Sequence, residues 1–341
     1  MAGHFQLRNR HWPAGASDRS SRSFLLSPSR SFPLLLLILL SASFSPILSI
    51  TDFSAPKLLA ATDEPPAEPA TARLVADVTS IEPGKTFRLG VHFRMEPLWH
   101  IYWHSARDGG LGTKIDWRLP EGLSAGELSW PVPKRYQLEG DLVAFGYGHE
   151  VLIFTEVTVD PNFSAEGPIE IGAQLSWLVC KKVCLIGAGN PTLSLPVGSA
   201  KPANGELFER FAARLPHDSE RAKAQGVLVS EQLISSAGGT APKEWQISVE
   251  FPQNLPPKKA FQLYPFDVPG ATLGLGSVET DGSTALIKFS IDVYDPEEFQ
   301  PARVGAVVSW GGPSKAKAGS GAPKGSASKT SALRVTVDAK R

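Results

Sequence analysis

Short runs of alternating apolar and polar residues, broken by glycine and proline, constrain the fold of this chain most. In the clearest run, residues 169–179, isoleucine, alanine, leucine, tryptophan and valine fill every second position. Side chains of a β-strand alternate between the faces of a sheet, so this run predicts a strand with one buried face. Runs at this spacing predict an antiparallel sandwich. The other strands expected in this first unit are residues 73–78, 86–93, 98–103, 115–119, 151–159 and 193–197.

A second β-rich unit is expected after a helix over residues 206–215, which Pro216 ends. The length of the whole chain, 341 residues, predicts about two domains, which we place at 62–200 and 201–341. The composition of residues 311–331, rich in Gly, Ser and Lys, is typical of a flexible hairpin loop or a linker. We favour the loop, because residues 333–337 alternate as a closing strand should. The other strands expected in this unit are residues 246–251, 260–264, 285–291 and 304–310.

The N-terminal segment, residues 1–61, has an arginine-containing stretch followed by an apolar run at residues 32–40. This order is typical of a secretory signal peptide. A retained membrane anchor is the alternative, because the apolar stretch extends with interruptions to Ile50. Either interpretation predicts an exported, periplasmic protein, in the second case attached to the inner membrane.

The net charge of zero hides an uneven distribution. Residues 62–310 carry −10, and the two ends of the chain carry the balancing +10. Because nucleic-acid binding relies on basic surfaces, the acidic body argues against a nucleic-acid partner.

Cys180 and Cys184 are the two cysteines of the chain and directly follow the strand at 169–179. By parity Cys180 falls on the polar face, where a partner could reach its thiol. One interpretation is an inert structural staple in an adhesion or scaffold module, but closing so short a ring constrains the unfolded chain by only about 2 kcal/mol. The other is a reactive dithiol, since the ammonium groups of Lys181 and Lys182 would favour the thiolate.

Three patches of the first unit occur together with this dithiol. They are residues 99–122, which begin Trp-His-Ile-Tyr-Trp-His, residues 130–150, which include Phe-Gly-Tyr-Gly-His-Glu, and residues 177–187 around the cysteines. As a set they resemble the N-terminal periplasmic domain of the thiol:disulfide interchange protein DsbD, particularly its ScsB-like branch. The resemblance covers roughly residues 74–197.

The resemblance implies an immunoglobulin-like domain that relays electrons by thiol–disulfide exchange, without a cofactor and with a link to cytochrome c biogenesis. It assigns the mixed disulfide to Cys184 and the resolving thiol to Cys180. It also implies an aromatic cap over the pair, formed by Phe145 or Tyr147. The neighbouring His149 and Glu150 could shuttle a proton, but the favoured interpretation is that they are surface residues of a hairpin.

Partners implied by the resemblance are thioredoxin-like redox proteins and a membrane electron carrier. Full-length members of the family continue into such a carrier and a thioredoxin domain, and neither is expected from this sequence. We therefore expect it to draw electrons from a separate protein or to have another function. The cysteines of the best-known members are also further apart.

Copper binding is the alternative function. Soft sulfur ligands select Cu(I), and Cys180 and Cys184 could bind it together with His100 and His104. These histidines alternate with Trp99, Ile101 and Trp103 and are expected on one side of a strand. The aromatic residues of the first unit, Tyr102 and the tryptophans, are expected to belong to the core or its rim and not to a ligand platform.

Overall fold

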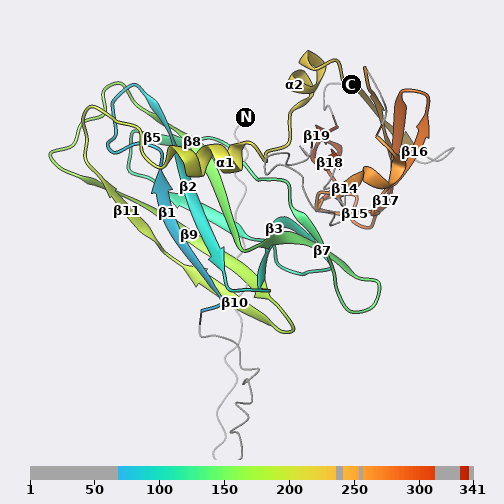
Figure 1. Ribbon diagram of the computed structural model, residues 1–341, viewed down its shortest axis with the longest axis horizontal. Helices are drawn as coiled ribbons and strands as arrows, with labels where there is room; N and C mark the ends of the chain where they lie inside the picture. Colours follow the sequence, from blue (N-terminus) through green and yellow to red (C-terminus); the bar gives the residue numbers. More distant parts are fainter. Residues whose placement is uncertain (1–67, 236–240, 253–255, 312–330, 338–341) are drawn as a thin grey trace, which may run out of the picture. The chain divides into compact units, whose positions relative to one another are not determined.

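The computed structural model describes residues 68–235, 241–252, 256–311 and 331–337 (Figure 1). The expected signal peptide or anchor, residues 1–61, lies outside this part, as does nearly all of the expected loop at 311–331. Among the described residues, no helix has the length and apolar character needed to cross a membrane. The described residues belong to one compact unit by their contacts, and a division near residue 200 stays a prediction.

The first half of the described chain forms two antiparallel sheets (Figure 1). One sheet has the order β1 (Ala70–Ala76), β2 (Thr86–Met95), β8 (Glu150–Val159) and β5 (Leu123–Ala125). The other has the order β10 (Cys184–Gly189), β9 (Ile169–Cys180), β3 (His100–Arg107), β7 (Val143–Gly148) and β6 (Lys134–Gln137), while β4 (Lys114–Arg118) and β11 (Thr192–Leu195) also pair with β9.

The core between these sheets follows the alternation seen in the sequence. Along β9, Ala173, Leu175, Trp177 and Val179 are buried, and Trp177 packs edge-on against Phe93 of β2 with 5.4 Å between ring centroids. The residues between them on β9 are mostly exposed or half-buried. The prediction of an all-β, immunoglobulin-like sandwich followed by a second β-rich region is confirmed.

A short helix covers the outer face of the four-stranded sheet. In α1 (Gly205–Ala212), Phe208 and Phe211 are the buried residues. Phe208 packs edge-on against Phe154 of β8, with 5.6 Å between ring centroids, and Figure 1 shows α1 lying across β2 and β8. The expected helix at 206–215 is thus present but ends earlier, and a second helix, α2 (Ser219–Ala224), follows it.

The later β-rich region contains two further sheets with a shared core. Trp245 and Phe289 stack within this core. The last two strands pair antiparallel, which confirms the closing strand expected near 333–337. The larger sheet contains β12 (Leu228–Ser235), β13 (Pro242–Glu250), β17 (Thr284–Val293), β15 (Ala271–Leu273) and β16 (Ser277–Asp281); the smaller contains β14 (Gln262–Pro265), β18 (Gly305–Trp310) and β19 (Ser331–Thr336), and the 3₁₀ turns are η1 (Lys258–Ala260) and η2 (Pro301–Arg303).

Strand β3 is irregular, and residues of the later region hold its irregular part. The register with β7 shifts between Tyr102 and Arg107. Asp267 accepts a hydrogen bond from the Ala106 amide at 3.1 Å, and its own amide donates to Ser105 Oγ at 3.0 Å. The Arg107 guanidinium also donates to the carbonyl of Leu273. These contacts fix the path of β3 beyond Tyr102.

Gly187 of β10 gives the first testable prediction. A Cβ at this position would lie 2.2 Å from the indole of Trp177, whereas a Cβ at Gly189 would meet only ordinary contacts of 3.8–4.0 Å. Neither glycine has a positive φ. We therefore expect Gly187→Ala to lower the free energy of unfolding by about 1–3 kcal/mol through overpacking, measured by urea denaturation.

Gly189→Ala is the matched control in the same strand and should leave stability unchanged or slightly raised. Equal losses in the two variants would contradict this account of Trp177 packing.

Candidate functional site

The two cysteines face each other across a tight hairpin. Cys180 ends β9 and Cys184 begins β10, and the antiparallel register makes them direct partners. Lys181, Lys182 and Val183 form the turn, which the Lys181 amide closes by donating to the Val183 carbonyl at 3.0 Å. The Cα atoms of the cysteines are 4.1 Å apart and their sulfurs form a disulfide. The pairing of the two strands therefore brings the sulfurs together.

The two sulfurs differ in environment. Cys180 is 3% exposed and packs in a small cluster with Tyr102, Ala106 and Ala144. The prediction that a partner could reach its thiol is therefore wrong, because these side chains cover that face of the sheet. Cys184 is exposed at the start of β10. Because thiol–disulfide exchange needs access to the attacked sulfur, the arrangement makes Cys184 the sulfur that another protein can reach.

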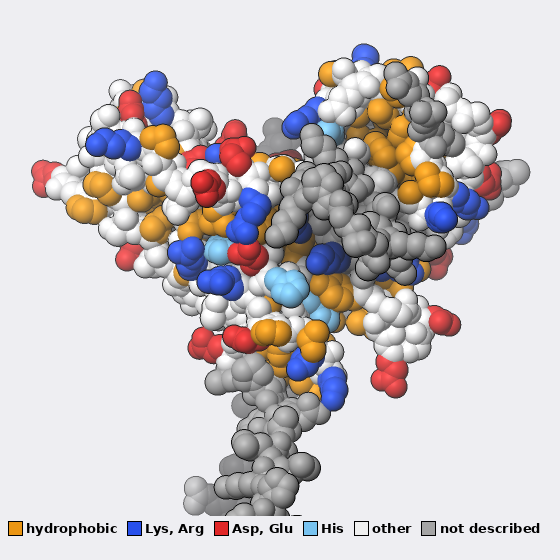
Figure 2. Space-filling view, in the orientation of Figure 1, with side chains coloured by type: hydrophobic (Ala, Val, Ile, Leu, Met, Phe, Trp, Pro, Cys, Tyr) orange, Lys and Arg blue, Asp and Glu red, His pale blue; other side chains and the backbone are white. Residues whose placement is uncertain are grey.

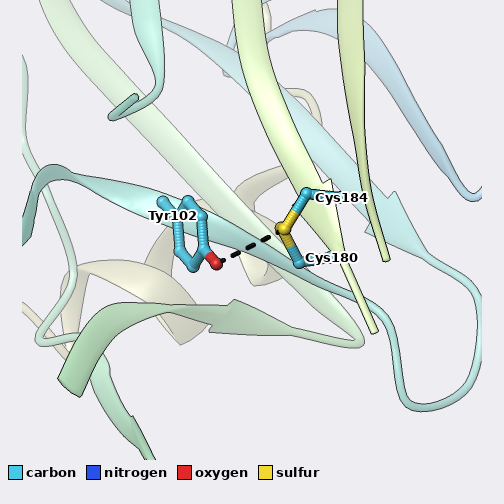
Figure 3. Close-up of a disulfide and its surroundings, with 3 residues drawn as sticks. All are labelled: Tyr102, Cys180 and Cys184. Carbon is cyan, nitrogen blue, oxygen red and sulfur yellow. Dashed lines mark hydrogen bonds between the residues drawn. A yellow bond between two sulfur atoms is a disulfide. The ribbon is translucent and has the colours of Figure 1, made fainter. Parts of the chain in front are cut away.

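Aromatic side chains surround the buried side of the disulfide. The hydroxyl of Tyr102 on β3 lies 3.8 Å from Cys184 Sγ (Figure 3). His100 lies opposite Cys180 in the pairing of β3 with β9. Its ring stacks on Tyr136 of β6 at 4.1 Å and meets Tyr102 edge-on at 5.4 Å. Burial lowers the pKa of His100, so the imidazole stays neutral near neutral pH.

Phe145 and Tyr147, expected to cap the dithiol, are fully buried in the core of the sandwich. Tyr147 donates its hydroxyl hydrogen to the Pro131 carbonyl at 2.6 Å. Ala144, the neighbour of Phe145 on β7, packs instead in the cluster with Cys180. Alternation along β7 thus directs both expected cap rings away from the face that carries the disulfide, and the rings found near the sulfurs are Tyr102 and Tyr136.

His149 and Glu150, the expected proton shuttle, have other contacts. Glu150 accepts from His92 Nε2 at 2.9 Å and from Arg210 at 2.6 Å. Burial would raise the pKa of Glu150, but these two hydrogen bonds and the charge of Arg210 outweigh it and lower the pKa. His149 is exposed in a left-handed conformation, and its carbonyl accepts from the Met95 amide. A proton-transfer role for the pair stays a prediction.

The lysines of the turn are both exposed beside Cys184. An exposed ammonium near a thiolate favours its ionisation, although solvent weakens the effect. Their predicted role in activating the thiol therefore has a suitable location, and it stays a prediction.

The histidines of the expected copper site lie in different surroundings. His100 is beside Cys180, whereas His104 contacts Trp103, Trp130 and Phe266. The irregularity of β3 beyond Tyr102 separates their environments. No group of three or more potential metal ligands occurs among the described residues. Copper binding stays an untested prediction.

Tyr102 is the site residue that sequence reasoning missed. Tyr102 was expected, like the tryptophans, to belong to the core or its rim, and it is indeed buried. The signal that could have revealed it is parity: Tyr102 and His100 lie two positions apart on β3 and share a face, and that face also carries Cys180 of the neighbouring strand.

Comparisons with known proteins agree with the motifs. Residues 68–195 match the family described as thiol:disulfide interchange protein DsbD, N-terminal. The structure is similar to the crystal structure of the N-terminal periplasmic domain of ScsB from Proteus mirabilis, with a TM-score of 0.51 and 16% sequence identity, covering 79% of this chain and 94% of that one. A search of curated proteins finds no match. The predicted resemblance to the DsbD N-terminal domain is thus confirmed over its sandwich.

The buried imidazole of His104 should make the stability of the folded protein depend on pH. Burial, with a smaller contribution from the charge of Arg334, lowers its pKa to about 3, against about 6.5 in the unfolded chain. Between pH 3 and pH 6.5 the unfolded state binds a proton at His104 that the folded state does not. The contribution of this residue to the free energy of unfolding is therefore fully present above pH 6.5 and decreases as the pH falls. From pH 7 to 5 the free energy of unfolding should fall by about 2 kcal/mol from this residue alone.

Urea denaturation of the oxidised protein at both pH values measures this loss. His104→Gln should reduce the difference between the two values. An unchanged difference would mean that His104 is accessible to protons in the folded state.

Proposed function

We propose that this protein carries out thiol–disulfide exchange in the periplasm, relaying reducing equivalents from a thioredoxin-like donor to oxidised proteins through Cys180 and Cys184. The single observation that carries the proposal is the asymmetric disulfide, with Cys184 exposed at a hairpin tip and Cys180 buried behind it. The match to the DsbD N-terminal family over residues 68–195 supports the same reaction.

The reaction would proceed in two exchanges through Cys184. A donor thiolate attacks Cys184 Sγ, Cys180 leaves as a thiolate, and the donor's second thiol resolves the mixed disulfide, which leaves the donor oxidised and this protein reduced. In the second exchange the Cys184 thiolate attacks a substrate disulfide. Cys180 then attacks Cys184 Sγ, which restores the disulfide and releases a reduced substrate. Relative reduction potentials set the direction.

Exposed apolar side chains near the hairpin support docking of protein partners. Ile186 is 81% exposed, shares a face of β10 with Cys184 and lies opposite Leu178 of β9. Val183 in the turn and Leu98, which precedes β3 at the same end of the sheet, are also exposed. Figure 2 shows that hydrophobic side chains reach the surface among charged ones on the face drawn. Exposed apolar groups around a reactive centre are typical of protein interaction sites.

Periplasmic location is part of this proposal. It is supported by the apolar N-terminal run of the sequence and by the similarity to a periplasmic domain. A membrane electron carrier as the ultimate source of electrons, and attachment to the inner membrane through residues 1–61, belong to the same proposal.

Trapping a mixed disulfide tests the exchange. Cys180→Ser protein lacks the resolving thiol, and it is mixed with a thioredoxin-like protein that also lacks its second cysteine and whose remaining cysteine carries a thionitrobenzoate group as a mixed disulfide. The Cys184 thiolate should displace thionitrobenzoate and form an adduct that neither protein can resolve. Non-reducing electrophoresis and mass spectrometry of the linked peptides detect it. Cys184→Ser is the matched control and should give little adduct, because Cys180 is buried. If Cys180→Ser forms no adduct with any thioredoxin-like protein offered, the proposal fails.

Ile186→Glu tests the docking surface. A charge beside Cys184 should reduce the rate of exchange with a thioredoxin-like protein on the order of tenfold, which corresponds to about 1.4 kcal/mol. Stopped-flow fluorescence measures this rate. The rate with a small disulfide such as oxidised glutathione should change little, since that molecule needs no docking surface.

Leu228→Glu is the matched control, because Leu228 is also exposed but lies on β12. Equal effects of the two substitutions on protein exchange would contradict a docking role for the surface around Ile186.

A further inference from the structure

We propose that Tyr102 is a catalytic hydrogen-bond donor that stabilises the thiolate of Cys184 during exchange. The inference rests on the proposed function and gives a role to Tyr102, which lies in the first sequence patch but to which neither the patch nor the family match assigns one. The observation behind it is the contact between the Tyr102 hydroxyl and Cys184 Sγ at 3.8 Å.

The direction of the hydrogen bond follows from the chemistry of the two atoms. A disulfide sulfur carries no hydrogen, so the phenol must be the donor. Tyr102 is 1% exposed, and burial raises its pKa, so the hydroxyl keeps its proton at physiological pH. Figure 3 shows the hydroxyl pointing toward the sulfurs.

The surroundings of Tyr102 hold its ring in place. Its carbonyl accepts a hydrogen bond from Thr113 Oγ1 at 2.6 Å. Gly109 lies so close to the phenol that a Cβ there would be 2.8 Å from the ring. The ring also packs in the cluster with Cys180, Ala106 and Ala144. The donor is therefore positioned before the reaction begins, so no reorganisation is needed when negative charge develops on Cys184.

The contact is weak with the disulfide and should strengthen when Cys184 ionises. Hydrogen bonds to a charged acceptor are shorter and roughly twice as strong as those between neutral groups. Stabilising the thiolate lowers the thiol pKa. The effect is placed on Cys184 because the hydroxyl contacts that sulfur, whereas the burial of Cys180 favours its neutral thiol. Tyr102 thus makes the exposed sulfur the better nucleophile near neutral pH.

The test measures the thiol pKa of Cys184 in full-length Cys180→Ser protein, where Cys184 is the remaining thiol, with and without Tyr102→Phe. Phenylalanine keeps the ring and removes the donor. The thiolate absorbance and the rate of alkylation by iodoacetamide, each followed against pH, should show the pKa of Cys184 rising by about one unit. Alkylation at pH 7 should slow several-fold, and the pH profile of exchange in the Tyr102→Phe protein with both cysteines should shift upward.

Tyr136→Phe is the matched control, since Tyr136 is another tyrosine packed against the same cluster. It should leave the pKa of Cys184 unchanged. Near-ultraviolet circular dichroism checks that both variants stay folded. An unmoved pKa in Tyr102→Phe, or an equal rise in Tyr136→Phe, would overturn the inference. Because iodoacetamide needs no protein partner, a failure of exchange with the pKa shift present would count against the proposed function and not against this role of Tyr102.

Discussion

The antiparallel pairing of β9 with β10 is the constraint on which the site depends. It makes Cys180 and Cys184 direct cross-strand partners, so a single register determines that the sulfurs meet. The same strand β9 supplies the alternating apolar side chains that fill the core between the two sheets. A strand fixed this firmly by its buried face cannot slip by one residue without reversing all its side chains. The stability of the sandwich therefore preserves the geometry of the dithiol.

Strand β3 is the second support of the site. Its first residues lie beside the end of β9 and carry His100 and Tyr102. Further along, Asp267 and Leu273 of the later β-rich region bind the irregular stretch around Ala106 and Arg107. The two regions are thus joined at the strand that bears the tyrosine nearest to Cys184. This gives the later region a structural part in the site although it contributes no cysteine.

The sequence alone predicted those parts of the structure that follow from the local pattern of apolar and polar residues. Alternation predicted β9 and its buried face, and it placed Cys180 on the opposite face, where the structure has it. β10 was not foreseen, because Gly187 and Gly189 interrupt its pattern, and the reason for Gly187 is the indole of Trp177 on the neighbouring strand.

The two histidines were expected to share one side of β3. They do not share an environment, because the register of β3 shifts after Tyr102, and contacts more than 150 residues away in the chain hold that stretch. Phe145 and Tyr147 show a further limit: their spacing places both on one face of β7, but only tertiary packing decides that this face is the core.

The reduction potential of the Cys180–Cys184 couple tests the central claim most directly. Equilibrating the full-length protein with dithiothreitol buffers of graded composition, and then alkylating the free thiols, gives the potential. An exchanging disulfide that is reached from solvent through Cys184 should have a potential above about −300 mV. A value well below that would mean a permanent structural bond, and would contradict the account of these sulfurs as a working redox centre.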